Sequence, residues 1–294
     1  MKKIIILFFM FFTFVLSESK MPVVNLGFLY QNIYVSQKEA GIAFKAWINK
    51  LEKRTDIKIN VKFYEDQATI LEDYLDKKTL DTIMINPVIF LKNRAILKRI
   101  SKKYYTFQIG DEKYIKYYLI KNKKIKKDIS KRLQNLDIVF NAEDSAAKLW
   151  FDKYTLENFG KPYRSVVSKE INLTKQIKVI YEVFFNQNTL AVVSNELYDT
   201  AVELNPQLKK DLEIISQSPR MFSIIFGMFN KNLSEETMMK LTTIINEFNT
   251  TAYGQDILAI ASLNKVVYIT DDELKKYEKF YKEYLKLKNQ YRRK

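Results

Sequence analysis

The sequence contains no histidine and no cysteine, and this absence excludes several kinds of chemistry. A Ser-His-Asp or Cys-His nucleophile, a Cys/His zinc site and thiolate redox chemistry each need one of these two residue types. Disulfide bonds and a lipid-modified N-terminal cysteine are excluded for the same reason. We therefore expect a protein that is not an enzyme and that binds no cofactor and no metal.

Glycine and proline are also scarce, with 6 and 5 residues in a chain of 294. Neither G-x-G-x-x-G nor G-x-x-x-x-G-K-[ST] occurs, so the sequence carries no glycine-rich phosphate loop. Hydrophobic residues, in contrast, make up 47% of the chain and aromatic residues 14%. This content is ample for a folded core and excludes a disordered chain.

Residues 1–19 have the features of a secretory signal peptide. Lys2 and Lys3 precede the apolar run 4–16, and Ser17 and Ser19 place small residues three and one positions before a cut. The run is shorter than the roughly 20 residues that span a bilayer, which leaves a retained anchor as the less favoured alternative. We expect export to the periplasm and cleavage after Ser19.

The basic charge of the chain does not indicate nucleic-acid binding. Lys+Arg number 49 against 34 Asp+Glu, and removal of residues 1–19 takes away two lysines and one glutamate, which leaves +14. A nucleic-acid surface gathers such an excess on one face with interleaved aromatics, whereas these lysines are spread along the chain beside acidic residues. A weak attraction to anionic ligands or membrane surfaces stays open.

Apolar periodicity predicts alternating strands and helices in the first hundred residues of the exported chain. Such alternation is typical of an α/β protein with parallel strands. The predicted strands are 23–29, 57–63 and 82–85, and the predicted helices are 36–51, 70–75 and 88–100.

The pattern changes at residue 104 and then resumes. Two runs, 104–109 and 114–120, flank Gly110 and predict a β-hairpin. A helix from Ser145 is expected to end at Gly160 as its C-cap. Everything after Ser234 is predicted to be helical. The further predicted strands are 136–140, 164–167, 189–193, 212–215 and 222–228.

Polar and aromatic side chains follow four of the predicted strands, at the points where helices begin. In an open α/β sheet ligands bind beyond the carboxyl ends of the strands, where helix N-termini present N–H groups. The alternative is that serine, aspartate and asparagine at these positions serve only as helix N-caps. The candidate ligand-binding residues are Tyr30, Gln31, Asn32, Asn86, Asp144, Ser145, Ser194, Asn195 and Tyr198.

In order along the chain, these features resemble the phosphate, phosphite and phosphonate-type substrate-binding proteins of ABC transporters. The resemblance covers roughly residues 22–285 and rests on five segments: VVNLGFLYQN (23–32), YLDKKTLDTIMINPVIFL (74–91), IGDEKYIKYYLIKNKKI (109–125), LDIVFNAEDSAAKLWF (136–151) and LAVVSNELYD (190–199).

The resemblance implies a two-lobed α/β fold of the type II periplasmic-binding-protein class. Lobe 1 would comprise 20–116 and 217–294, and lobe 2 would comprise 117–216. Two crossing strands near 117–120 and 214–218 would form the hinge. The ligand would lie between the lobes.

One segment departs from the family's pattern. Where the family has a turn rich in glycine, serine and threonine, this chain has EDSAA (143–147), in which only Ser145 keeps a hydroxyl. A carboxylate that faced a phosphonate would repel it. Three interpretations remain: Asp144 caps the helix and faces away, it binds a cationic group of the ligand, or the ligand is not a phosphonate.

These observations predict an exported, monomeric solute-binding protein that closes around a small polar solute and delivers it to an ABC permease. The expected solute is an oxyanion such as phosphonate, phosphite or phosphate. The alternative is the same fold acting as a ligand-sensing input to a membrane sensor kinase or cyclase. An enzyme would need Glu143 and Asp144 as acid and base, but adjacent residues at a helix start point apart.

Overall fold

The computed structural model describes residues 21–29, 48–49, 52, 56–126, 129, 133–222, 225–260 and 263–293. The predicted signal peptide and nearly all of the predicted helix 36–51 lie outside these residues. Within the described ranges, every helix is too short or too polar to cross a membrane.

One of the two large sheets has six strands in the order β13-β4-β12-β3-β1-β2. The neighbours β2, β1 and β3 are parallel, whereas β12, β4 and β13 pair antiparallel. Segments from both ends of the described chain therefore contribute to one sheet. Its strands are β1 (Val23–Leu29), β2 (Lys58–Tyr64), β3 (Thr82–Ile85), β4 (Ser101–Gln108), β12 (Phe226–Asn230) and β13 (Lys265–Ile269).

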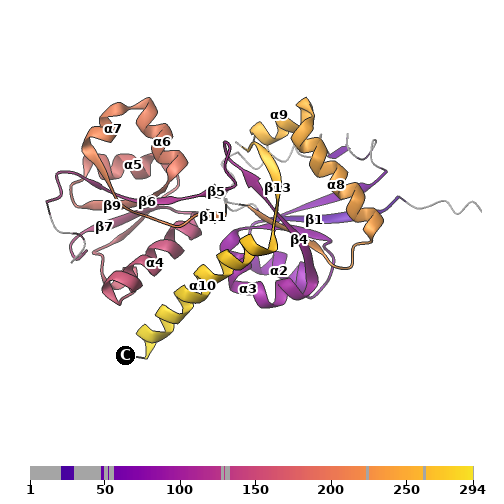
Figure 1. The fold of residues 1–294 in the computed structure, drawn as a ribbon, viewed down its shortest axis with the longest axis horizontal. Helices are drawn as coiled ribbons and strands as arrows, with labels where there is room; N and C mark the ends of the chain where they lie inside the picture. The colour runs from indigo at the N-terminus through magenta and orange to yellow at the C-terminus, as the bar shows by residue number, and fades with distance from the viewer. Residues whose placement is uncertain are drawn as a thin grey trace, which may run out of the picture.

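Helices cover both faces of this sheet, as its buried central strands require. On one face lie α2 (Gln67–Leu75) and α3 (Pro87–Ile100), and on the other α8 (Glu235–Thr250) and α9 (Ala252–Ile260) (Figure 1). Side-chain caps start three of them: Asp66 for α2, Asn86 for α3 and Ser234 for α8.

The second large sheet has five strands in the order β10-β6-β9-β7-β8. Its strands β8, β7 and β9 are parallel, and β6 lies antiparallel between β9 and β10. The helix α4 (Ser145–Phe159) covers one face, and α5 (Gln176–Phe185), α6 (Asn195–Leu204) and α7 (Pro206–Asp211) cover the other (Figure 1). The strands are β6 (Tyr117–Asn122), β7 (Asp137–Asn141), β8 (Glu170–Leu173), β9 (Thr189–Ser194) and β10 (Leu212–Gln217).

Two short strands connect the sheets. The chain passes from β4 to β6 through β5 (Tyr114–Ile115) and returns from β10 to β12 through β11 (Met221–Phe222). The two strands pair antiparallel with each other between the larger sheets (Figure 1). The two α/β units joined by two crossings confirm the predicted fold class. The lobe boundaries at 116/117 and 216/217 stay a prediction.

The C-terminal helix α10 (Asp271–Arg292) runs from the six-stranded sheet to α4 of the other unit (Figure 1). It begins with a capping box between Thr270 and Glu273. Its Glu278 pairs with Lys98 of α3, at 2.8 Å between Nζ and Oε1. Further along, the Tyr284 hydroxyl donates to Asp152 of α4 at 2.8 Å. The helix therefore bonds to both units.

Three sequence-based assignments were wrong. The predicted hairpin is not formed: in the described chain the turn at Gly110 has only an isolated bridge between Ile109 and Glu112, and β4 pairs with β12 and β13 inside the sheet. The predicted strand 164–167 is a 3-10 helix (Tyr163–Ser165), and the strand follows as β8. The part after Ser234 is not wholly helical, since it contains β13. Two of the errors concern strands whose partners are distant in sequence, since β4 pairs with β12 and β13.

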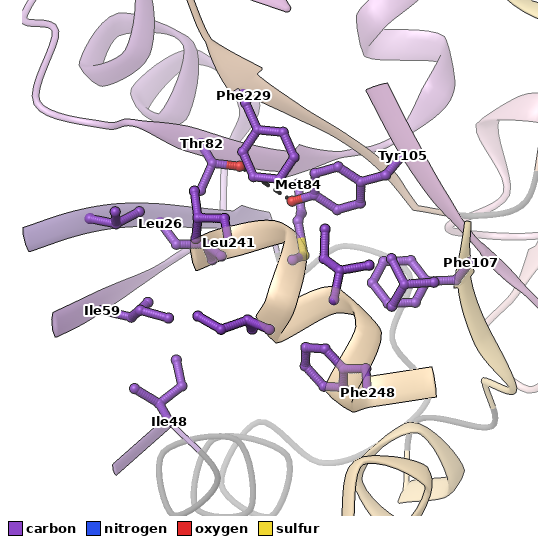
Figure 2. Close-up of a pocket in the computed structure, with 14 residues that line it drawn as sticks. Leu26, Ile48, Ile59, Thr82, Met84, Tyr105, Phe107, Phe229, Leu241 and Phe248 are labelled. Atoms are coloured by element: carbon purple, nitrogen blue, oxygen red, sulfur yellow. Dashed lines mark hydrogen bonds between the residues drawn. The ribbon is translucent and has the colours of Figure 1, made fainter. Parts of the chain in front are cut away.

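A small void lies in the core between the six-stranded sheet and α8 (Figure 2). Its volume is about 50 Å³, and most of its lining is aliphatic or aromatic. The Thr82 hydroxyl at its wall donates to the carbonyl of Met228 at 2.9 Å and lies 3.3 Å from the Tyr105 hydroxyl. Apolar voids of this kind stay dry, so this one is unsuited to a polar solute.

Candidate ligand-binding site

Two helices from different sheets begin next to each other. Strand β3 leads into α3 and strand β7 leads into α4, and these two helices pack together. Asn86 is the N-cap of α3, because its Oδ1 accepts from the backbone N–H of Val88 at 2.8 Å. Asp144 is the N-cap of α4, because its Oδ1 accepts from the N–H of Ala147 at 3.0 Å.

A hydrogen bond joins these two helix starts. The Ser145 hydroxyl, in the first turn of α4, donates to Asn86 Oδ1 at 3.1 Å. Asn86 is 7% exposed, so its amide lies inside the junction between the two units. Two predicted ligand-binding residues that are 59 positions apart in the sequence are thus in direct contact.

Asp144 is held by groups of its own unit. Besides the N–H of Ala147, the Tyr117 hydroxyl donates to its Oδ1 at 2.8 Å. Burial raises the pKa of Asp144, and these two hydrogen bonds oppose the rise. The structure therefore supports the capping interpretation. The carboxylate occupies an N–H group that would otherwise be available to a ligand.

Where β9 ends and α6 begins, the polar side chains also make hydrogen bonds within the protein. The Ser194 hydroxyl accepts from the N–H of Leu197 at 3.2 Å and caps the helix. Asn195 bonds twice to Lys116: its Oδ1 accepts from the Lys116 N–H and its N–H donates to the Lys116 carbonyl, each at 2.8 Å. These two hydrogen bonds join the segment between β5 and β6 to the start of α6.

Tyr198 lies in the core of the five-stranded unit, where its ring packs edge-to-face on Tyr118 at 5.7 Å. Burial raises its pKa, so the hydroxyl is protonated at neutral pH. Tyr30, Gln31 and Asn32 lie outside the described residues. A ligand contact by any of the nine predicted residues stays a prediction.

Two buried polar groups were not among the residues predicted from the sequence. Glu196 in the first turn of α6 has a buried Oε1 without a hydrogen-bond partner in the described part of the chain. Burial, with Asp199 and Glu112 nearby, raises its pKa to about 7. The Tyr277 hydroxyl on α10 is likewise buried without a partner there. Their sequence context, an acid in a first helical turn and an aromatic on an amphipathic helix, is ordinary and gave no signal.

The described residues contain no group of three or more acidic side chains arranged to hold a metal ion. The junction instead combines hydroxyl, amide and carboxylate groups with two helix N-termini. Such groups bind and orient a small polar molecule. Together with two α/β units joined by two crossings, they define a two-lobed solute-binding protein.

Comparison with known families agrees with this class. The sequence profile described as "ABC transporter, phosphonate, periplasmic substrate-binding protein" matches residues 33–274. The chain belongs to this family. Its predicted family, fold and role in ABC transport are therefore confirmed. The family is one of transport proteins of the periplasm that deliver a small solute to a permease. No curated protein sequence gives a significant match.

Solved structures show the same fold at low sequence identity. A Xanthomonas citri protein with bound chloride ion has a TM-score of 0.68 and 12% identity, covering 91% of this chain and 99% of its own. A binding-protein component of an ABC phosphonate transporter from Pseudomonas aeruginosa has a TM-score of 0.59 and 16% identity, covering 92% of this chain and 98% of its own. PhnD1 from Prochlorococcus marinus, in complex with methylphosphonate, has a TM-score of 0.59 and 16% identity, covering 88% of this chain and 96% of its own.

Proposed function

We propose that this chain binds a small oxyanion, of the phosphonate, phosphite or phosphate class, where α3 and α4 begin. The observation that carries the proposal is the hydrogen bond between Ser145 and Asn86, because it joins polar groups of the two units. A ligand there contacts both units at once. In a protein that closes by a hinge, such contacts favour the closed form.

The two helix N-termini favour a negatively charged ligand. The partial positive charge at the start of a helix attracts anions, and α3 and α4 direct theirs toward one junction. The Ser145 hydroxyl and the Asn86 amide can supply hydrogen bonds to its oxygens. The fixed carboxylate of Asp144 opposes a dianion, so an oxyanion that keeps one proton fits better.

The proposed hinge comprises the two crossing strands near 117–120 and 214–218, next to the paired strands β5 and β11. The proposed lobes are then 20–116 with 217–294, and 117–216. Ser194, Asn195 and Tyr198 belong to the second lobe, and Tyr30, Gln31 and Asn32 to the first. The exported protein is a monomer, with its signal peptide removed after Ser19.

The test is isothermal titration of the exported protein with methylphosphonate, phosphite, phosphate and sulfate, for wild type and Ser145→Ala. A ligand at about a hundred times its dissociation constant stabilises the fold by roughly 2.7 kcal/mol, so thermal unfolding gives a second readout. We expect the wild type to bind a phosphorus oxyanion and Ser145→Ala to bind it about tenfold more weakly, because one hydrogen bond to a charged ligand is lost.

Ser234→Ala is the matched control. It removes a serine hydroxyl at the start of α8, where the side chain accepts from the N–H of Thr237 at 3.1 Å. This control should lower the stability by about 1 kcal/mol and leave the affinity unchanged. Failure of the wild type to bind any of the four anions would refute the ligand class. Equal affinities of wild type and Ser145→Ala would refute the site.

A further inference from the structure

A buried hydroxyl without a partner lies on α10. Tyr277 is 5% exposed, and its hydroxyl makes no hydrogen bond within the part of the chain that the structure describes. Nearly all buried polar groups in native proteins are hydrogen-bonded, because burial removes their water. An exception calls for an explanation, and a bound molecule or an ordered water as the partner is one.

The position of Tyr277 is fixed by its surroundings. Its ring packs edge-to-face on Phe222 of β11 at 4.7 Å, and Phe222 in turn stacks on Tyr114 of β5 at 5.5 Å. One turn before it, Glu273 accepts from the Tyr114 hydroxyl, and directly after it Glu278 pairs with Lys98. The hydroxyl thus lacks a partner although the helix around it is bonded on both sides.

Packed rings connect Tyr277 to the start of α3, because Phe222 lies 5.7 Å from Phe226, which stacks on Phe90 of α3 at 4.4 Å. Burial raises the pKa of Tyr277 well above 10, and the charge of Asp144 is close enough to raise it further. The hydroxyl therefore stays protonated and acts as a donor. The Asp144 oxygen Oδ1 already accepts from Tyr117 and Ala147, and Ser145 next to it donates to Asn86. The unpartnered donor is thus within electrostatic range of this polar cluster.

We propose that Tyr277 is a ligand-binding residue whose hydroxyl donates a hydrogen bond to an oxygen of the solute held where α3 and α4 begin. This inference rests on the proposed function. It adds α10, the helix that bonds to both units, as a third element of the site. It also deepens the ligand class, since a donor beside a fixed carboxylate calls for an oxygen acceptor. The competing occupant is an ordered water between Tyr277 and Asp144.

Tyr277→Phe tests the proposal, because it removes only the hydroxyl. The exported protein is titrated calorimetrically with methylphosphonate and with phosphite, and its thermal unfolding is measured without ligand. We expect the affinity of Tyr277→Phe to fall at least tenfold, which corresponds to about 1.4 kcal/mol. We expect its unfolding temperature without ligand to stay at or above that of the wild type, since no protein hydrogen bond is lost.

Tyr284→Phe is the matched control on the same helix. Its hydroxyl has a partner in the protein, Asp152, so this variant should unfold at a lower temperature and keep the wild-type affinity. Wild-type affinity in Tyr277→Phe would overturn the inference alone. An unfolding temperature of Tyr277→Phe as low as that of Tyr284→Phe would also overturn it, because the hydroxyl would then have a structural partner. A wild type that binds neither anion would refute the proposed function, and this inference with it.

Discussion

Glu196 provides a quantitative test of how burial controls charge in this protein. Its carboxyl lies in the first turn of α6 with Oε1 buried and without a partner in the described chain. Burial first, and the charges of Asp199 and Glu112 second, raise its pKa from 4.5 to about 7. The folded protein therefore holds a proton on Glu196 in a pH range where the unfolded chain has lost it.

The direction of the pH effect on stability follows from the linkage between protonation of Glu196 and folding. A group whose pKa is higher in the folded state contributes its full stability below pH 4.5, and this contribution is lost as the pH rises to about 7. A rise from 4.5 to about 7 corresponds to about 3 kcal/mol. Because the side chain keeps partial contact with solvent, water offsets part of this penalty, and we expect about 1–3 kcal/mol.

The perturbation is Glu196→Gln, which has the shape of the protonated acid and no charge. At pH 8 the variant should be more stable than the wild type by about 1–3 kcal/mol, because it avoids the buried charge. At pH 4.5 the difference should nearly vanish. Urea unfolding of both proteins at several pH values between 4.5 and 8 measures the difference directly.

Glu203→Gln serves as the control, since Glu203 is an exposed glutamate on the same helix. Its substitution should change the stability by less than about 0.5 kcal/mol at any of these pH values. A stability difference for Glu196→Gln that stayed constant from pH 4.5 to 8, or a variant less stable than the wild type at pH 8, would refute the reasoning.

Two further predictions concern the packing that holds the units in place. Asp152→Ala should destabilise the protein by about 2–4 kcal/mol in urea unfolding, because it leaves the Tyr284 hydroxyl and the Lys288 ammonium without their buried partner. A loss below 0.5 kcal/mol would show that the contact of α10 with α4 is weak. Gly227→Ala should cost about 2–4 kcal/mol, since the added methyl would lie 2.1 Å from the buried ring of Tyr105; unchanged thermal unfolding would contradict this.

The helices that could be predicted from the sequence are those whose starts and ends are marked by nearby residues. The helix from Ser145 was recognisable because its cap and its end are encoded within a few residues. Asp144 caps it, and Gly160 ends it with a φ of +64°, a conformation that glycine adopts without strain. The strand, asparagine and proline that start α3 are equally local. Such signals also predict Asn86 and Ser145 at helix starts, but not the hydrogen bond between them.

Pairing and burial, in contrast, depend on residues far apart in the sequence. Strand β4 lies between β12 and β13, which come more than a hundred residues later, so its own neighbourhood suggested a hairpin. The sequence also left three interpretations of Asp144 open. The hydrogen bond from Tyr117 to this carboxylate supports the cap, and it depends on the position of β6 beside α4.

Local patterns predicted the two α/β units and the helix starts at their junction, and the resemblance of five segments predicted the family that the sequence profile shows. Which of those polar groups are in contact, and which lack a partner, depends on how segments far apart in the sequence pack together. Tyr277 is the clearest case, since an aromatic residue at helical spacing is normally a core residue. Only the packing of α10 across both units places its hydroxyl, buried and unpartnered, near Asp144.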